Sequence, residues 1–212
     1  MPEPVLRNVF ATPVIEAVLD AMPDQIGTLK STILERRQTH PGQASRSNIL
    51  GWHSDSKMIE WAGSPAQQLA RSTLETCIGY THDLGRGKDA GPRFEFGMEM
   101  WANVSPAGAS NQMHAHPGSF WSAVFYVDDG GDPDEGQLVL LDPRFPTNRV
   151  AAPDIAMGEP PDPGQPLSQL LIRPEIGKVV IFPSWLMHAV RPHNGPRDRI
   201  SIAMNILVRQ VA

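Results

Sequence analysis

The sequence has little cysteine: Cys77 is the only one in 212 residues. A single thiol cannot form a disulfide within the chain, and a protein without disulfides suits a reducing compartment. No apolar run approaches the length that crosses a membrane, and no charged segment followed by an apolar one opens the chain. These absences predict a soluble cytoplasmic protein without a membrane partner.

Positive charge is also scarce, because 18 Lys and Arg residues stand against 23 Asp and Glu residues, for a net charge of −5. No basic cluster occurs, which argues against nucleic acid as a partner. The Gly-x-x-x-x-Gly-Lys phosphate loop, the Gly-x-Ser-x-Gly nucleophile turn and the Cys-x-x-Cys pair are missing as well. Nucleotide-phosphate, serine-nucleophile and dithiol chemistry therefore find no support.

What the sequence does contain is typical of a globular protein, with 41% apolar and 19% charged residues. We expect one domain, residues 1–212, with its helices in the first half. Residues 23–38 carry apolar side chains at helical spacing. A second helix is predicted from Ser64, which would cap it, with Pro65 at the first helical position. Cys77 falls on the buried face of that helix, so we interpret it as structural rather than nucleophilic.

From Phe94 the apolar spacing changes from the helical period to alternation, which predicts a strand. Further short strands are expected at residues 136–141, 169–173, 178–182 and 199–209. Residues 143–166 carry seven prolines and should form an irregular loop, of the kind that often serves as a lid or binding loop. The predicted fold class is mainly β, a sandwich or closed barrel. Residues 1–92 would supply flanking helices and edge strands, and residues 93–212 the β core with the functional site.

Two histidines, His114 and His116, stand two residues apart before an apolar run rich in aromatic and β-branched residues. Residues i and i+2 of a strand project to the same face, so we expect both imidazoles to point one way from the lip of that strand. A third histidine, His188, precedes the segment Arg199-Ile-Ser201. Three donors on neighbouring strands can bind one face of a metal, while an adjacent arginine and serine hold a carboxylate.

Other residues offer alternative ligands. His53-x-Asp55 is a pair that many mononuclear iron enzymes use, but its flanking serines and the lack of a following strand pattern favour solvated polar groups in a turn. Glu99 is a further candidate carboxylate, which would have to swing toward the metal. We interpret His193, in Pro-His-Asn-Gly, as a turn residue.

Four short motifs occur in the second half: His114-x-His116-Pro, Asp142-Pro-Arg, Phe182-Pro-Ser-Trp-Leu-x-His188 and Arg199-Ile-Ser-Ile. Together they resemble the Fe(II)/2-oxoglutarate-dependent dioxygenases, and more narrowly a bacterial branch of that superfamily. The resemblance covers about residues 99–208, half of the chain. It implies a double-stranded β-helix, or jelly-roll, with Fe(II) at its open end and 2-oxoglutarate as co-substrate.

The resemblance also implies roles for individual residues at the 2-oxoglutarate site. Arg199 and Ser201 match the pair that holds the far carboxylate of 2-oxoglutarate. Tyr126 matches a tyrosine that often helps to bind that carboxylate, and Asn103 is a further candidate contact. The implied activity releases succinate and carbon dioxide and commonly hydroxylates a substrate, here a small molecule or a peptide.

For the metal, the resemblance implies that His114 is the proximal ligand and His188 the distal one. The usual third ligand is Asp or Glu, whereas this chain has His116. Either three histidines bind the iron, or His116 does not bind the iron directly but contacts its ligands, and water fills the third coordination position. Imidazole ligands also suit Zn, Cu and Ni, so the native metal stays open.

Two other functions stay open. One is a three-histidine, cupin-like enzyme that does not use 2-oxoglutarate, although such an enzyme has no reason to hold a distal carboxylate with an Arg-x-Ser pair. The other is a non-catalytic jelly-roll that binds a metal or a small ligand. A homo-oligomer is compatible with the sequence in each case.

Overall fold

The computed structural model describes residues 3–19, 22–43, 47–85, 93–147, 155, 157–158 and 162–211. The helices in this part of the chain are α1 (Pro23–Thr39), α2 (Met58–Trp61) and α3 (Gly63–Gly79). The strands are β1 (Ile15–Val18), β2 (Asn48–Ile49), β3 (Trp52–His53), β4 (Phe94–Ser105), β5 (Ala109–His114), β6 (Trp121–Asp128), β7 (Leu138–Leu141), β8 (Gln169–Ile172), β9 (Lys178–Pro183), β10 (His188–His193) and β11 (Arg199–Gln210). Among these helices, none combines the length and the apolar character that crossing a bilayer demands.

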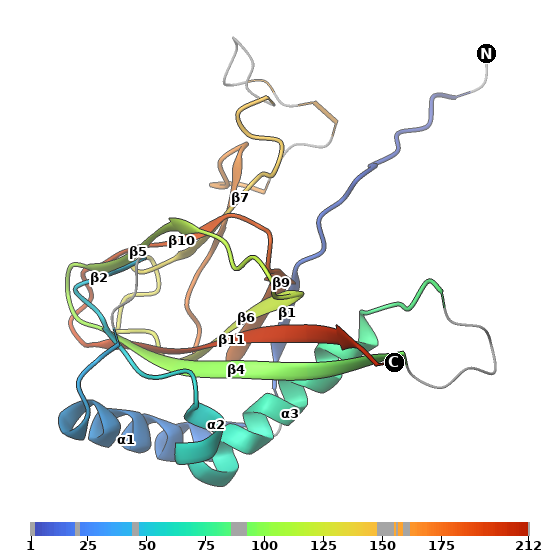
Figure 1. Cartoon of the computed structure of the whole chain (residues 1–212). Coiled ribbons are helices and arrows are strands. Elements are labelled where there is room, and N and C mark those ends of the chain that lie inside the picture. Colours follow the sequence, from blue (N-terminus) through green and yellow to red (C-terminus); the bar gives the residue numbers. More distant parts are fainter. Residues whose placement is uncertain are drawn as a thin grey trace.

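The strands form two antiparallel sheets that lie as two layers (Figure 1). The larger sheet has the order β1-β9-β6-β11-β4-β3, and the smaller one has the order β2-β5-β10-β7-β8. The long strand β11 pairs with β4 on one side and with β6 on the other. The prediction of a mainly β, jelly-roll architecture with helices from the N-terminal half is confirmed. The two sheets stay open, however, and do not close into a barrel.

The helices cover the outer face of the larger sheet, as Figure 1 shows for α1 and α3 below β4 and β11. Alternate residues of these strands point toward the helices and are apolar, so their burial provides most of the hydrophobic stabilisation. Met100, Ile202 and Met204 belong to this core together with Leu29 of α1 and Leu69 of α3.

The opposite face of the same strands points toward the smaller sheet and is largely polar. Asn103, Ser201 and Asn205 alternate with the core residues of β4 and β11 and line a cavity between the sheets. A smaller apolar cluster, which includes Tyr126 and Phe182, fills the space beside that cavity. Strand alternation thus separates a structural face from a face that can carry a site.

Helix α3 buries Cys77 as predicted. The same helical spacing also predicts a buried Tyr80, but Tyr80 lies past the helix end and is exposed. The predicted Ser64 cap is wrong, because the helix begins at Gly63 and makes no side-chain capping bond. The preceding short helix α2 runs almost directly into α3, and Gly63 adopts a φ of 68° at the junction. Ser64 therefore lies inside the helix rather than at its cap.

Two other features differ from the prediction or extend it. Strand β10 was not predicted, because its sequence His-Ala-Val-Arg-Pro-His has no alternation and contains Pro192. It nevertheless pairs with β5 on one side and β7 on the other. Much of the predicted loop at residues 143–166 lies outside the described residues, and its first described part, residues 143–147, forms turns.

We expect folded protein to resist alkylation at Cys77. Its side chain is fully buried in the helix–sheet core, and burial raises the pKa of the thiol to about 12. The thiolate is the reactive form, so at pH 8 the thiol is both protonated and inaccessible. Mass spectrometry after iodoacetamide treatment should show no label on folded protein and full label in denaturant. Rapid labelling of the folded state would contradict a structural role.

Candidate active site

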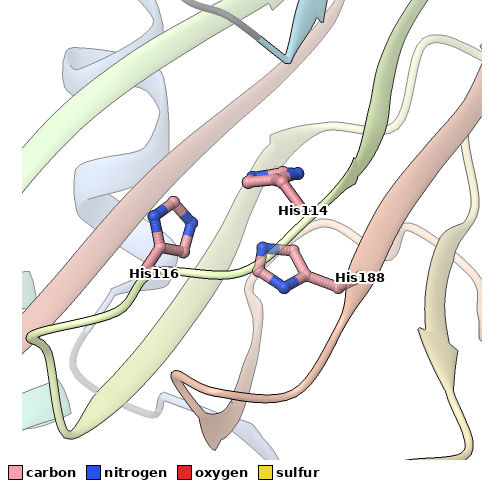
Figure 2. Close-up of side chains that lie close together, drawn as sticks. All are labelled: His114, His116 and His188. Carbon is pink, nitrogen blue, oxygen red and sulfur yellow. The ribbon is translucent and has the colours of Figure 1, made fainter.

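Three histidines converge at the mouth of the space between the two sheets. His114 is the last residue of β5, His188 is the first residue of β10, and the two are paired in register. His116 follows in the loop before β6. The ring centroids are 4.3 Å apart for His114 and His188, 4.9 Å for His114 and His116, and 5.1 Å for His116 and His188. One nitrogen from each ring lies within 4.8 Å of the others, and Figure 2 shows the rings gathered around a common space.

The local route to this arrangement differs from the predicted one. We expected both histidines to project from one face at the lip of the following strand, but only His114 is in a strand, and it ends β5. The strand ends there, so Ala115 and His116 lie outside the sheet, and Pro117 and Gly118 form a turn after them. The His116 backbone N–H instead donates to the Ser184 carbonyl at 2.9 Å. That bond ties the loop to the segment just before β10, which carries the third histidine.

Backbone hydrogen bonds orient two of the imidazoles. His114 Nδ1 lies 2.7 Å from the Gln112 carbonyl oxygen, and His188 Nδ1 lies 2.8 Å from the Leu186 carbonyl oxygen. A carbonyl oxygen only accepts, so each Nδ1 donates its hydrogen and each Nε2 keeps a free lone pair. Metal-binding histidines are typically held in this way by their second nitrogen.

The protonation of the cluster also suits a metal. Burial lowers the pKa of His188 to about 3, with its bond to Leu186 opposing the shift and the nearby His114 and His116 adding to it. Burial and the neighbouring His114 lower the pKa of His116 to about 4. Both rings are therefore neutral near pH 7, and a neutral imidazole is the form that binds a metal.

A buried guanidinium lines the same cavity as the histidines. Arg199 opens β11 and is 2% exposed, yet among the described residues it forms no ion pair. Its Nη1 makes one long hydrogen bond, 3.4 Å to Ser201 Oγ, and its guanidinium lies 5.2 Å from the Tyr126 ring centroid. Its Nε and the Tyr126 hydroxyl are buried without a hydrogen-bond partner in the described part of the chain. Such a set of unsatisfied donors is costly unless a ligand binds them.

The charge state of these groups favours an anionic ligand. Burial lowers the pKa of Arg199, but an arginine remains protonated at neutral pH. Burial raises the pKa of the Tyr126 phenol, so its hydroxyl stays protonated and can donate. A fixed positive charge and the Ser201 hydroxyl therefore face one space, with the Tyr126 phenol buried next to the guanidinium, and such a donor set suits a carboxylate.

The three histidines and Arg199 share a cavity of about 110 Å³ between the sheets, and Ser201 and Asn103 also line it. Tyr126 is buried beside it under the Arg199 guanidinium. The structure thus brings together the residues that the sequence motifs singled out, although they lie up to 98 positions apart in the chain. A metal at the histidines and a carboxylate at Arg199 would therefore share one small space.

Further cavity walls were missed by the sequence motifs. Trp101 lies edge-on to His116, with ring centroids 6.0 Å apart, and Ser122 Oγ donates to Asn205 Oδ1 at 3.0 Å. Trp101 stands two residues before Asn103, and Asn205 four residues after Ser201, so each shares a strand face with a predicted site residue. The alternation of the two long strands was the signal that could have identified them.

The interpretation of His53 and Asp55 needs correction. His53 is not in a solvated turn: it lies in β3, opposite Asn103 of β4, and lines the cavity. Asp55 has a structural role, because its carboxylate accepts from Arg36 Nη2 at 2.8 Å and from Trp61 Nε1 at 3.0 Å. The two do not form a metal pair, since the described residues contain one group suited to a metal, the three histidines.

Glu99 and His193 take no part in the histidine cluster. Glu99 is exposed on β4 and is not among the grouped ligand atoms. His193 is not a turn residue, because it closes β10, is fully buried and bonds through Nε2 to the Arg197 carbonyl at 2.7 Å. Its ring packs against Gly130, where a side chain would not fit.

Comparison with known proteins decides the family. Residues 99–205, just over half of the chain, match the family described as "Putative 2OG-Fe(II) oxygenase". The chain belongs to the 2OG-Fe(II) oxygenase family. Among curated proteins, no sequence matches this 2OG-Fe(II) oxygenase significantly.

Solved structures show the same fold at low sequence identity. A Pseudomonas putida prolyl-4-hydroxylase is 19% identical, covering 95% of this chain and 94% of its own, with a TM-score of 0.58. A Trichoplax adhaerens prolyl hydroxylase, in complex with a peptide fragment of the hypoxia inducible factor, is 14% identical, with coverages of 91% and 83% and a TM-score of 0.59. HygX from Streptomyces hygroscopicus, with nickel and 2-oxoglutarate bound, is 13% identical, with coverages of 92% and 82% and a TM-score of 0.56.

The cofactor and co-substrate of this 2OG-Fe(II) oxygenase are Fe(II) and 2-oxoglutarate, and the residues present fit both. Imidazole nitrogens with free lone pairs bind Fe(II), and the oriented rings of His114 and His188 offer two of them. A dicarboxylate suits a buried cation that lacks a protein counter-ion, and Arg199 is such a cation in the described part of the chain.

We expect Gly136→Ala to weaken 2-oxoglutarate binding by about tenfold while iron binding changes little. Gly136 adopts a φ of 63°, and a Cβ there would lie 2.8 Å from Arg199 Cδ. The substitution would therefore push the Arg199 side chain out of its place. Gly164→Ala is a matched control, because Gly164 has a φ of 84° but nothing within 4 Å of an added Cβ. Equal losses in both variants, measured by calorimetric titration, would show backbone strain rather than crowding of Arg199.

Proposed function

We propose that this protein is an Fe(II)- and 2-oxoglutarate-dependent dioxygenase that hydroxylates a small molecule or a peptide. The observation that carries the proposal is the buried guanidinium of Arg199, which has no carboxylate partner among the described residues, in the same small cavity as three convergent histidines. A site for metal alone has no use for that cation. A site for a carboxylate alone has no use for three imidazoles whose nitrogen atoms converge.

In this proposal His114 and His188 hold the metal through Nε2, and His116 supplies the third imidazole. Three neutral ligands add no negative charge at Fe(II), so the metal-binding carboxylate of 2-oxoglutarate would supply negative charge there in place of a protein carboxylate, while the far carboxylate balances Arg199. The absence of Asp and Glu from the described cavity lining supports this assignment of charges. It also explains why a histidine at position 116 is compatible with the usual cofactor pair.

The far carboxylate of 2-oxoglutarate is assigned to Arg199 and Ser201, with Tyr126 donating its phenol hydrogen. These donors belong to neighbouring strands, since Ser201 of β11 is paired in register with Tyr126 of β6. Asn103 is assigned as an additional contact on β4, opposite Ser201. A guanidinium fixed by burial loses little freedom on binding, so it can hold the co-substrate in one orientation.

When bound together, Fe(II) and 2-oxoglutarate supply the oxidative chemistry, in which dioxygen converts 2-oxoglutarate to succinate and carbon dioxide and one oxygen atom is inserted into the substrate. The chain's own task is to orient the two groups and keep water out. Phe182 packs 4.8 Å from the His188 ring, and Leu138 and Val190 add apolar lining. These side chains lower the local polarity around the metal ligands.

The proposed substrate class is supported by the range of enzymes that share this fold. Similar folds belong to enzymes whose structures contain a peptide fragment or the small molecule hygromycin B, so the architecture admits both kinds of substrate. Residues 93–212 would carry the catalytic core and residues 1–92 the supporting helices and edge strands. Among residues 1–92, His53 lines the cavity directly.

The proposal is tested by measuring succinate formed from 2-oxoglutarate with Fe(II) and ascorbate under air. We expect slow succinate formation that requires Fe(II) and is abolished by a chelator. A three-histidine enzyme without 2-oxoglutarate chemistry would bind metal but form no succinate and show no calorimetric binding of 2-oxoglutarate. A non-catalytic protein would bind one or both ligands without any turnover, and either result would reject the dioxygenase.

A further inference from the structure

His53 reaches the active-site cavity from a strand that the metal and co-substrate assignments do not use. It lies in β3, opposite Asn103 of β4, so its side chain shares the cavity face of the larger sheet. Its ring stacks on Trp101 with centroids 5.5 Å apart and an interplanar angle of 24°. Trp101 in turn lies edge-on to His116. His53 and Trp101 therefore form an aromatic wall next to the metal histidines.

The hydrogen bonding of His53 leaves one nitrogen available. Nδ1 lies 2.6 Å from the Ser54 carbonyl oxygen, which only accepts, so Nδ1 carries the ring hydrogen. Burial lowers the pKa of His53, with two backbone hydrogen bonds opposing the shift, so the ring is neutral near pH 7. Nε2 then presents a lone pair, and no described residue bonds to it. An acceptor without a partner on a cavity wall is suited to a donor on a ligand.

The charge of the cavity restricts what that ligand can be. Among the described residues that line it, Arg199 has the one permanent charge, and no Asp, Glu or Lys is present. The proposed function uses Arg199 for 2-oxoglutarate. A substrate ammonium or carboxylate would therefore lose its hydration without gaining a counter-ion, which disfavours both. The remaining polar groups, such as Asn111 and Ser47, are uncharged.

We infer that His53 and Trp101 form the substrate-orienting wall of this oxygenase, and that they select an uncharged substrate group with an O–H or N–H donor. His53 Nε2 accepts the donor hydrogen, and the Trp101 ring holds the apolar body of the substrate beside the metal site. This inference deepens the proposed function and rests on it. It assigns His53 a positioning and specificity role rather than a place among the metal ligands.

A series of four matched probes tests the inference on protein loaded with Fe(II) and 2-oxoglutarate under nitrogen, where turnover cannot occur. The probes are 2-phenylethanol, its methyl ether, 2-phenylethylamine and phenylacetate, and binding is measured by ligand-observed NMR. We expect the alcohol to bind about tenfold more tightly than the ether, which lacks the donor, because one hydrogen bond contributes about that factor. The amine and the acid should be weaker than the alcohol by a similar factor.

The His53→Phe variant keeps a flat ring against Trp101 but removes the acceptor. We expect it to bind the alcohol and the ether equally, while His82→Phe, at an exposed site, keeps the native preference. Circular dichroism and loading with Fe(II) and 2-oxoglutarate confirm that each variant is folded. If His53→Phe does not fold, the native series still decides.

The inference is overturned if the native protein binds alcohol and ether equally, prefers a charged probe, or binds no probe at about 10 mM. It is also overturned if His53→Phe retains the preference. Failure of the proposed function is a separate result, because it would appear earlier, as failure to bind Fe(II) or 2-oxoglutarate before any probe is added.

Discussion

Arg199→Met is expected to weaken 2-oxoglutarate binding by at least about a hundredfold while leaving Fe(II) uptake nearly unchanged. The guanidinium is buried, and the described residues include no carboxylate paired with it, so its interaction with a bound dicarboxylate is not shared with a protein anion. Methionine fills part of the same volume without the charge. Calorimetric titration of 2-oxoglutarate into Fe(II)-loaded protein under nitrogen measures the loss.

Thermal unfolding provides an independent readout of the same change. A ligand that binds only the folded state raises the melting temperature, so 2-oxoglutarate should stabilise native protein but not Arg199→Met. Arg209→Met is the matched control on the same strand, because Arg209 is exposed and pairs with Glu95. Equal losses of iron and 2-oxoglutarate binding in Arg199→Met, or no loss of either, would count against the assigned role.

His188→Ala is expected to abolish stoichiometric iron uptake. The His188 ring centroid lies 4.3 Å from that of His114 and 5.1 Å from that of His116, and its Nε2 is directed by the Nδ1 bond to Leu186. Loss of a group that merely supports a ligand typically costs 10- to 100-fold in metal affinity, so loss of the ligand itself should exceed about a hundredfold. Iron content after anaerobic gel filtration measures the effect.

Two further variants make this iron experiment decisive. His188→Gln retains side-chain bulk in a buried position and separates ligand loss from cavity formation. His82→Ala removes an exposed histidine and should keep full iron uptake. If His188→Ala retained one iron per chain, His188 would leave the proposed ligand set, and the metal would have to be sought elsewhere.

Predicting the fold from the sequence worked best where periodicity was long. The alternation that begins at Phe94 predicted β4, and helical spacing in residues 23–38 predicted α1. In a long element the apolar pattern repeats several times, so one residue that departs from the pattern does not hide it. Strand β10 was missed because its six residues contain a proline and polar side chains, and its pairing partners are distant in sequence. The prediction of a Ser64 cap was wrong because α2 leads almost directly into α3, which begins before Ser64.

The site was predicted unevenly for the same physical reason. Arg199, Ser201 and His188 belong to motifs that occur in the same order as in a known family. Their residue types and spacing therefore indicated a site before any contact was known. His53 was misassigned to a turn, because a two-residue strand has no periodicity of its own and depends on pairing with β4. Glu99 was a reasonable carboxylate candidate by chemistry, but its position on β4 leaves it exposed and outside the histidine group.

The sequence by itself determined the chemistry on offer: histidines and an arginine in the order of a known family, on strands whose alternation gives each one an apolar and a polar face. Only the tertiary structure decided which of these groups meet. Long-range strand pairing places His114 opposite His188, and burial leaves Arg199 without a protein anion among the described residues. Pairing register and burial arise from contacts between segments far apart in the chain, so no local pattern contains them.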